Sequence, residues 1–78
     1  MWYYLFGGNM YNKLLNLKNL RELNNLSNKK MADKLGISKT FYWQIENGKR
    51  NLSYDMAIRI SKVLKSKPDK IFYDDFKN

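Results

Sequence analysis

The sequence of 78 residues carries 15 lysines and arginines against 7 aspartates and glutamates, a formal net charge of +8. A chain of this length supports one domain whose core contributes roughly 3–5 kcal/mol, and its positive charge favours a polyanionic partner, nucleic acid first and an anionic membrane surface second. Because cysteine and histidine are both missing, we expect no disulfide, no metal site, no cofactor and no enzymatic activity.

The first 12 residues, MWYYLFGGNMYN, contain no charged side chain, whereas the remainder is basic. We therefore divide the chain into an aromatic extension, 1–12, and a domain, 13–78. The extension lacks the basic start and the cleavage site of a signal peptide, and no stretch approaches the ~18 apolar residues of a membrane span, so we expect a soluble cytoplasmic protein. The extension is either an arm packed on the domain or on a second subunit, or a floppy tail; its many aromatic side chains favour the arm.

The first predicted helix spans residues 11–23. Its leucines at 14, 17 and 20 follow helical spacing, and those at 15 and 23 broaden the apolar stripe. Asn24 and Asn25 can end this helix, because asparagine tolerates a left-handed backbone.

The next two predicted helices, 28–35 and 38–46, are short and lie close together in the sequence. Ser27 and Ser38 supply the N-terminal caps, and Gly36 between them allows the positive φ of a tight helix end. Two short helices joined by a glycine-containing corner form a helix-turn-helix.

Two further helices complete an all-α domain. One begins after the cap Ser53 and buries a stripe of Met56, Ala57, Ile60, Val63 and Leu64; the other starts near Pro68. Ile71 and Phe72 of the last helix are expected to close the core.

A helical wheel divides the predicted helix 38–46 into two faces. Phe41, Tyr42 and Ile45 form an apolar arc, and the outward face carries Lys39, Thr40, Trp43 and Gln44. Such a face suits the DNA major groove: lysine can donate to guanine or phosphate, glutamine can pair with adenine, and threonine and tryptophan can contact a thymine methyl. Alternatively, the indole folds over the helix edge onto the core or covers a dimer contact.

Four polar or basic side chains flank this face and are candidate phosphate contacts. One lies at the start of helix 28–35 and three follow helix 38–46; they are Asn28, Asn47, Lys49 and Arg50.

Residues 17–72 resemble the five-helix DNA-binding domain of the phage repressor and Cro family, also called Xre-type regulators. The resemblance rests on the joint pattern LRE, SNKKMADKLGIS, IENGKR and SYDMAIRI. It implies base reading at Lys39, Thr40 and Gln44, phosphate contacts at Asn28, Asn47 and Lys49, and a buried ion pair between Arg21 and Glu46. Relatives usually have glutamine at position 28 and a small or polar residue at position 43, and the extension 1–12 has no counterpart.

We therefore predict a sequence-specific, double-stranded-DNA-binding transcriptional regulator, a repressor that binds a pseudo-palindromic operator as a homodimer. The dimer contact would come from Ile71, Phe72 and Phe76, or from the aromatic extension. One alternative is an antitoxin-like or adaptor protein whose arm docks a protein partner. Another is a membrane-surface protein, against which the buried faces of four further helices argue.

Overall fold

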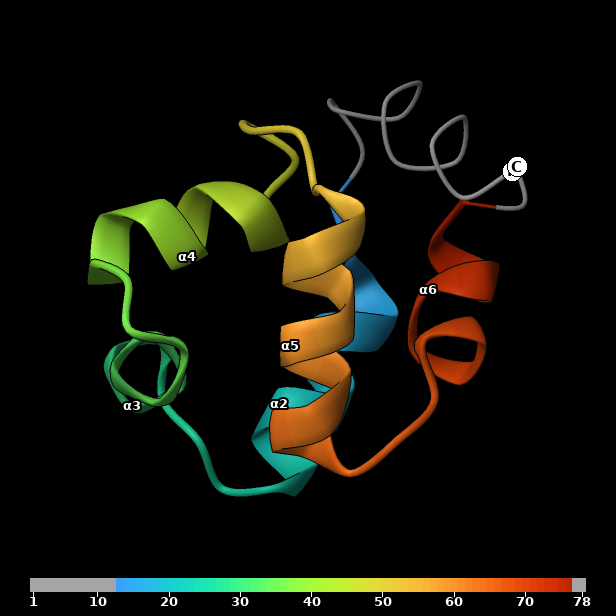
Figure 1. Ribbon diagram of the computed structural model, residues 1–78, viewed down its shortest axis with the longest axis horizontal. Coiled ribbons are helices and arrows are strands. Elements are labelled where there is room, and N and C mark those ends of the chain that lie inside the picture. The colour runs from blue at the N-terminus through green and yellow to red at the C-terminus, as the bar shows by residue number, and fades with distance from the viewer. Residues whose placement is uncertain (1–12, 77–78) are drawn as a thin grey trace.

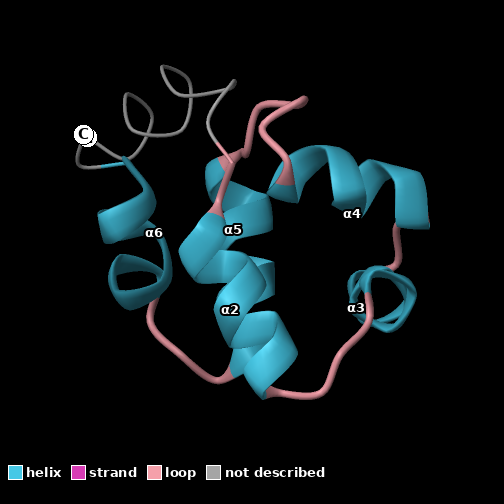
Figure 2. Cartoon of the chain, turned by 180° about the vertical axis from the view of Figure 1, so that it is seen from behind, coloured by secondary structure: helices cyan, strands magenta, loops and turns pink. Residues whose placement is uncertain are grey.

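The computed structural model describes residues 13–76 of the chain, with side chains up to residue 72. All regular elements in this part are helices, as predicted: α2 (Leu15–Leu23), α3 (Asn28–Leu35), α4 (Lys39–Glu46), α5 (Tyr54–Leu64) and α6 (Pro68–Phe76). Helix α5 crosses in front of α2, with α3 and α4 on one side and α6 on the other (Figure 1). The same order is seen from behind (Figure 2). None of the described helices is long and apolar enough to cross a membrane.

Serine caps begin three of these helices, as the sequence predicts. The hydroxyl oxygens of Ser27, Ser38 and Ser53 each accept a hydrogen bond, at 3.0–3.1 Å, from the backbone N–H three residues later. Each cap satisfies one of the N–H groups that a helix start leaves without an intrahelical partner.

The first described helix begins later than predicted. Leu14 has a non-helical backbone, with φ −93° and ψ 77°, and its N–H donates to the carbonyl oxygen of Glu46 at 2.9 Å. This long-range bond holds Leu14 outside the helix, so α2 starts at Leu15. Residues 11 and 12 of the predicted helix lie outside the described residues.

The corner between α3 and α4 is built on Gly36, whose φ of +73° is left-handed. The following residue, Ile37, donates its N–H back to the carbonyl of Ala32 at 3.0 Å and packs against the core. Arg59 of α5 donates to the carbonyl of Leu35. These bonds satisfy the last carbonyls of α3 and turn the chain into α4, which gives the predicted helix-turn-helix.

The core forms where all five helices meet. Its largest fully buried side chains are Leu17, Met31, Leu35, Tyr42, Ile45, Ile60, Ile71 and Phe72. Met56, Ala57 and Leu64 of the predicted α5 stripe are also buried, and Val63 is partly buried against the core.

Two leucines contradict the predicted stripe of the first helix. Leu15 is 59% exposed and Leu23 is 77% exposed. Each lies two positions from a buried residue of α2, Leu17 or Arg21, and is therefore rotated by about 200° around the helix. The buried face of α2 is narrower than its leucine content suggests.

The predicted dimer contact through Ile71 and Phe72 is also wrong. Both side chains are fully buried within the chain, between α6 and the rest of the core. They cannot meet a second subunit while the domain is folded. The side chain of Phe76 and the aromatic extension, the other predicted contacts, lie outside the described residues.

Candidate nucleic-acid interface

A buried ionic clamp joins α2 to the end of α4. Arg21 donates from Nε to Oε2 of Glu46 at 2.8 Å and from Nη2 to Oε1 at 2.9 Å. The Tyr42 hydroxyl donates to the same Oε2 at 2.7 Å, and Arg21 Nη1 donates to the Leu26 carbonyl at 2.6 Å. Only 6% of Arg21 and 5% of Glu46 is exposed. The structure thus pairs the two residues that the family resemblance brings together.

The clamp stabilises the proton-bearing forms of its two donors. Hydrogen bonding to Glu46 raises the pKa of Arg21, whereas burial, followed by the negative charge of Glu46, raises the pKa of Tyr42. Both donors therefore keep their protons at neutral pH, and every hydrogen bond of the clamp is available. Since α4 carries both Tyr42 and Glu46, the clamp fixes the orientation of this helix on α2.

The outward face of α4 is open to solvent. Lys39, Thr40 and Trp43 are exposed and Gln44 is half-buried. Trp43 is 44% exposed, so its side chain is not folded into the core. The only acidic residue of α4 is Glu46, which the clamp neutralises. This face is therefore a largely exposed row of polar and aromatic side chains without negative charge.

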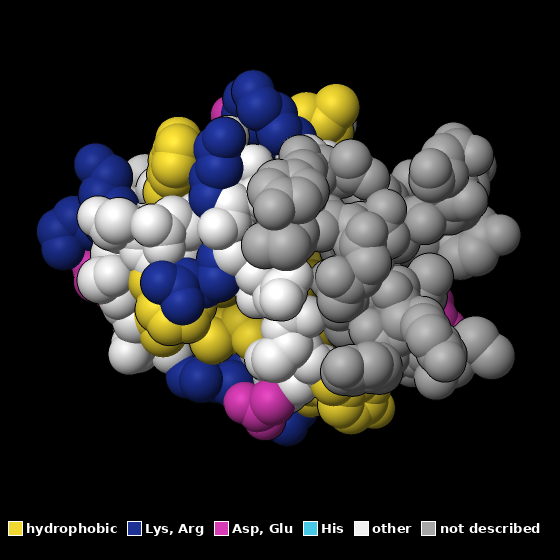
Figure 3. Space-filling view, turned by 90° about the horizontal axis from the view of Figure 1, so that it is seen from above, with side chains coloured by type: hydrophobic (Ala, Val, Ile, Leu, Met, Phe, Trp, Pro, Cys, Tyr) yellow, Lys and Arg dark blue, Asp and Glu magenta, His cyan; other side chains and the backbone are white. Residues whose placement is uncertain are grey.

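Basic side chains outnumber acidic ones on the side of the molecule that carries α4 (Figure 3). Figure 3 looks onto the side of the molecule where α4 and its following loop lie, and shows more lysine and arginine than acidic side chains among the described residues. Lys49 in the loop is exposed, and its backbone N–H donates to the Gln44 carbonyl at 2.8 Å. The loop is thereby held against the C-terminal end of α4.

Asn47 and Asn28, two of the predicted phosphate contacts, differ from each other in how their side-chain amides are placed. The Asn47 side chain donates from Nδ2 to the Trp43 carbonyl at 2.9 Å and so caps α4. Asn28 at the start of α3 is half-buried, and its Oδ1 is buried without a hydrogen-bond partner among the described residues. Because the Oδ1 atom of Asn28 is buried, the Nδ2 group is the part of this amide that can donate to a ligand.

Arg50, the fourth predicted phosphate contact, lies against α4. Its Nε donates to the side-chain Oε1 of Gln44 at 3.1 Å, and the centre of its guanidinium lies 4.4 Å from the centroid of the Phe41 ring. The sequence reasoning missed this arrangement and treated Phe41 only as a core residue. The sequence did contain a signal for this contact. An aromatic residue stands three positions before the outward glutamine, and an arginine follows in the next loop.

Residues 17–71, more than half of the chain, match the helix-turn-helix family. The chain belongs to the helix-turn-helix family of Xre-type regulators. This confirms the resemblance seen in the sequence, and the match covers α3 and α4 together with the helices that pack on them.

Similar helix-turn-helix proteins occur in bacteria and archaea. An uncharacterized HTH-type transcriptional regulator of Methanocaldococcus jannaschii, MJ0272, is 40% identical over 60 residues, 76% of this chain and 91% of its own length. The uncharacterized HTH-type transcriptional regulator YqaE of Bacillus subtilis is 43% identical over 49 residues, 63% of this chain but only 42% of its own length. The matched region thus spans less than half of YqaE. These relatives do not favour the antitoxin-like or adaptor alternative.

A solved helix-turn-helix structure matches the fold. The restriction-modification controller protein C.AhdI of Aeromonas hydrophila superposes with a TM-score of 0.69 and 26% sequence identity. The superposition covers 73% of this chain and 83% of C.AhdI.

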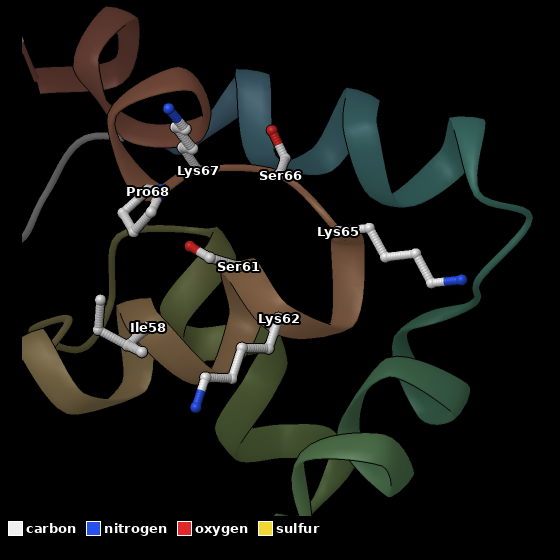
Figure 4. Close-up of a pocket in the computed structure, with 7 residues that line it drawn as sticks. All are labelled: Ile58, Ser61, Lys62, Lys65, Ser66, Lys67 and Pro68. Atoms are coloured by element: carbon white, nitrogen blue, oxygen red, sulfur yellow. The ribbon is translucent and has the colours of Figure 1, made fainter.

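A second basic surface lies outside the helix-turn-helix, where α5 meets α6. An open groove there has an apolar floor that includes Ile58 and Pro68, and three lysines line it, Lys62, Lys65 and Lys67 (Figure 4). The groove contains no residue of α3 or α4. We interpret its lysines as solvated charges that add to long-range attraction of a polyanion.

Proposed function

We propose that this DNA-binding transcriptional regulator reads base edges in the major groove through α4 and acts as a repressor by occupying its site. The observation that carries the proposal is the outward face of Lys39, Thr40, Trp43 and Gln44 on the second helix of a helix-turn-helix, which we name the reading face; three of these residues are exposed and Gln44 is half-buried. In this motif the second helix lies in the major groove and the first crosses the backbone. The clamp between Arg21 and Glu46 presents that face in one orientation.

Each side chain of the face has a role that its chemistry supports. Lys39 donates to a guanine edge or a phosphate, and the amide of Gln44 forms hydrogen bonds with a base edge. Thr40 and Trp43 provide apolar contact for a thymine methyl. The family resemblance implies a small or polar residue at position 43, and we expect the large indole of Trp43 to give this chain its own sequence preference.

Phosphate contacts hold the face in register. The exposed amine of Lys49 sits in the loop after α4, and the Nδ2 donors of Asn28 sit at the start of α3. In the proposed complex these side chains grip the DNA backbone on the two sides of the groove. Asn47 supports the same contact indirectly, because its amide caps α4.

The protein occupies its site as a homodimer on a pseudo-palindromic operator. One recognition helix contacts only a few base pairs, so two-fold pairing doubles the length of sequence read. Sedimentation of the protein with and without its selected duplex measures the number of subunits bound. A single subunit on an asymmetric site would contradict this part of the proposal.

Selection of bound sequences from random double-stranded DNA tests the function directly. We expect an enriched motif with two inverted half-sites. Gln44→Ala should relax the preference at one position of each half-site, at a cost of about 1–3 kcal/mol. Lys49→Ala should instead weaken binding to all sequences alike and reduce the slope of log affinity against log salt by about 0.9 for each subunit bound, so by about 1.8 for the dimer.

The pair of variants separates base reading from backbone binding. Failure to enrich any motif would contradict the function. Identical behaviour of the two variants on selected and random DNA would contradict the assigned roles.

A further inference from the structure

The loop after α4 contacts Gln44 at both its backbone and its side chain. The Lys49 N–H donates to the Gln44 carbonyl at 2.8 Å, and the next residue, Arg50, donates from Nε to the Gln44 Oε1 at 3.1 Å. Two successive loop residues thus hold one residue of the reading face. Neither contact is part of the hydrogen-bond ladder of the helix.

Arg50 is itself held by an aromatic ring. Its guanidinium lies over Phe41, 4.4 Å from the ring centroid, and Phe41 also packs against the core. The planar guanidinium can stack on a ring and donate sideways at the same time, which the amine of a lysine cannot do. The core, Phe41, Arg50 and Gln44 therefore form one chain of contacts that ends on the reading face.

This chain of contacts bears on the cost of reading a base. An unrestrained glutamine side chain loses rotamer freedom when it is fixed, which costs up to about 2 kcal/mol. Restraint before binding removes part of that cost and favours the one geometry that fits a base edge. The hydrogen bond also orients the amide, because Oε1 faces the arginine and the Nε2 donors face away from it.

We infer that Arg50 is a positioning residue for sequence reading, which orders the Gln44 amide so that Nε2 donates to an acceptor on a base edge. The inference rests on the proposed function of α4. It assigns Arg50 a different role from the phosphate contact that the sequence suggests. The two roles differ in what they change, because a phosphate contact strengthens binding to all DNA whereas a positioning residue changes discrimination at one base pair.

The test compares Arg50→Lys with the wild type on the selected duplex and on versions substituted at the base pair that Gln44→Ala identifies. The substitution keeps the charge but removes the planar donor. We expect discrimination at that base pair to fall by about three- to tenfold. Affinity for random DNA and the salt slope should remain near those of the wild type. Phe41→Leu, which keeps an apolar side chain and removes the ring, should cause the same selective loss.

A double-mutant cycle shows whether Arg50 acts through Gln44. In the Gln44→Ala background, Arg50→Lys should cause no further loss of discrimination. Lys49→Ala is the matched control from the same loop: it should lower affinity for all sequences and reduce the salt slope while discrimination stays. Thermal unfolding of each variant checks that the selective loss occurs in a folded domain.

Two results would overturn the inference. The first is that Arg50→Lys discriminates between base pairs as well as the wild type does. The second is that Arg50→Ala loses affinity equally for selected and random DNA and has a lower salt slope, which would show that Arg50 is a phosphate contact. Failure of the proposed function looks different. In that case the wild-type protein itself would prefer no sequence, and the Gln44→Ala comparison would have no base pair to identify.

Discussion

Removal of one member of the buried clamp should destabilise the domain more than removal of the whole clamp. Glu46→Leu leaves the guanidinium of Arg21 buried, with the Leu26 carbonyl as its one remaining clamp partner. Breaking a buried ion pair in this way costs about 3–5 kcal/mol, which equals the roughly 3–5 kcal/mol that a core of this size provides. We therefore expect Glu46→Leu to be largely unfolded at room temperature.

A triple variant removes every charged or hydroxyl group of the clamp. In Arg21→Met, Tyr42→Phe and Glu46→Leu combined, only the Leu26 carbonyl loses a partner, at a cost of about 1–3 kcal/mol. Similar side-chain volumes and the loss of buried charge limit the remaining cost. The triple variant should thus be about 1–3 kcal/mol more stable than Glu46→Leu alone, although it carries two further substitutions.

Urea unfolding followed by far-ultraviolet circular dichroism measures these differences. A low temperature and a stabilising osmolyte keep the single variant folded enough for a baseline. Additive losses, with the triple variant less stable than Glu46→Leu, would refute the reasoning. They would mean that the clamp stabilises the domain mainly through packing.

Three further predictions concern local features of the fold. Gly36→Ala should lower the unfolding temperature by about 4–8 °C, because alanine is strained at the positive φ of this position. The added Cβ would not clash, since among the described residues it meets only Arg59 Nη2 at 3.8 Å. An unchanged unfolding temperature would mean that the backbone of the corner relaxes. Ser38→Ala should cost about 1 kcal/mol in urea unfolding, since the Phe41 N–H loses its cap, and Ser38→Asp should restore most of it. Burial and Glu46 raise the pKa of Tyr42, so above pH about 10 the unfolded chain releases this proton while the folded chain keeps it, and the free energy of unfolding should fall as pH rises. Tyr42→Phe should flatten that fall, and an unchanged profile would contradict the assignment.

Most helix boundaries could be predicted because their signals are local. Ser27, Ser38 and Ser53 cap through bonds to residues three positions away, and Gly36 ends α3 through its own backbone freedom. The start of α2 could not be predicted in this way, because it depends on a hydrogen bond from Leu14 to a carbonyl 32 positions later. Lys65, which ends α5 in a left-handed conformation with φ of 54°, also carried no sequence signal.

In the candidate site, too, the features set by local sequence could be predicted and those set by long-range contacts could not. Helical periodicity placed Lys39, Thr40 and Trp43 on the outward face of α4, and all three are exposed. Periodicity could not tell which leucines of α2 face the core, because that depends on where α4 and α6 pack. Nor could it show Arg50 folding back onto Gln44, since that contact depends on the path of the loop.

The backbone bond between Leu14 and Glu46 also has a mechanical consequence. It ties the residue that precedes α2 to the terminal turn of α4. Tension applied through the backbone ahead of Lys13 would therefore load the end of α4 through this bond, together with the core through the buried Leu14 side chain, before it could peel α2 away. Tension applied from the other end would first load α6, which carries no residue of the reading face. The two ends of the described residues would therefore respond differently to tension, because the N-terminal end is bonded to the end of α4.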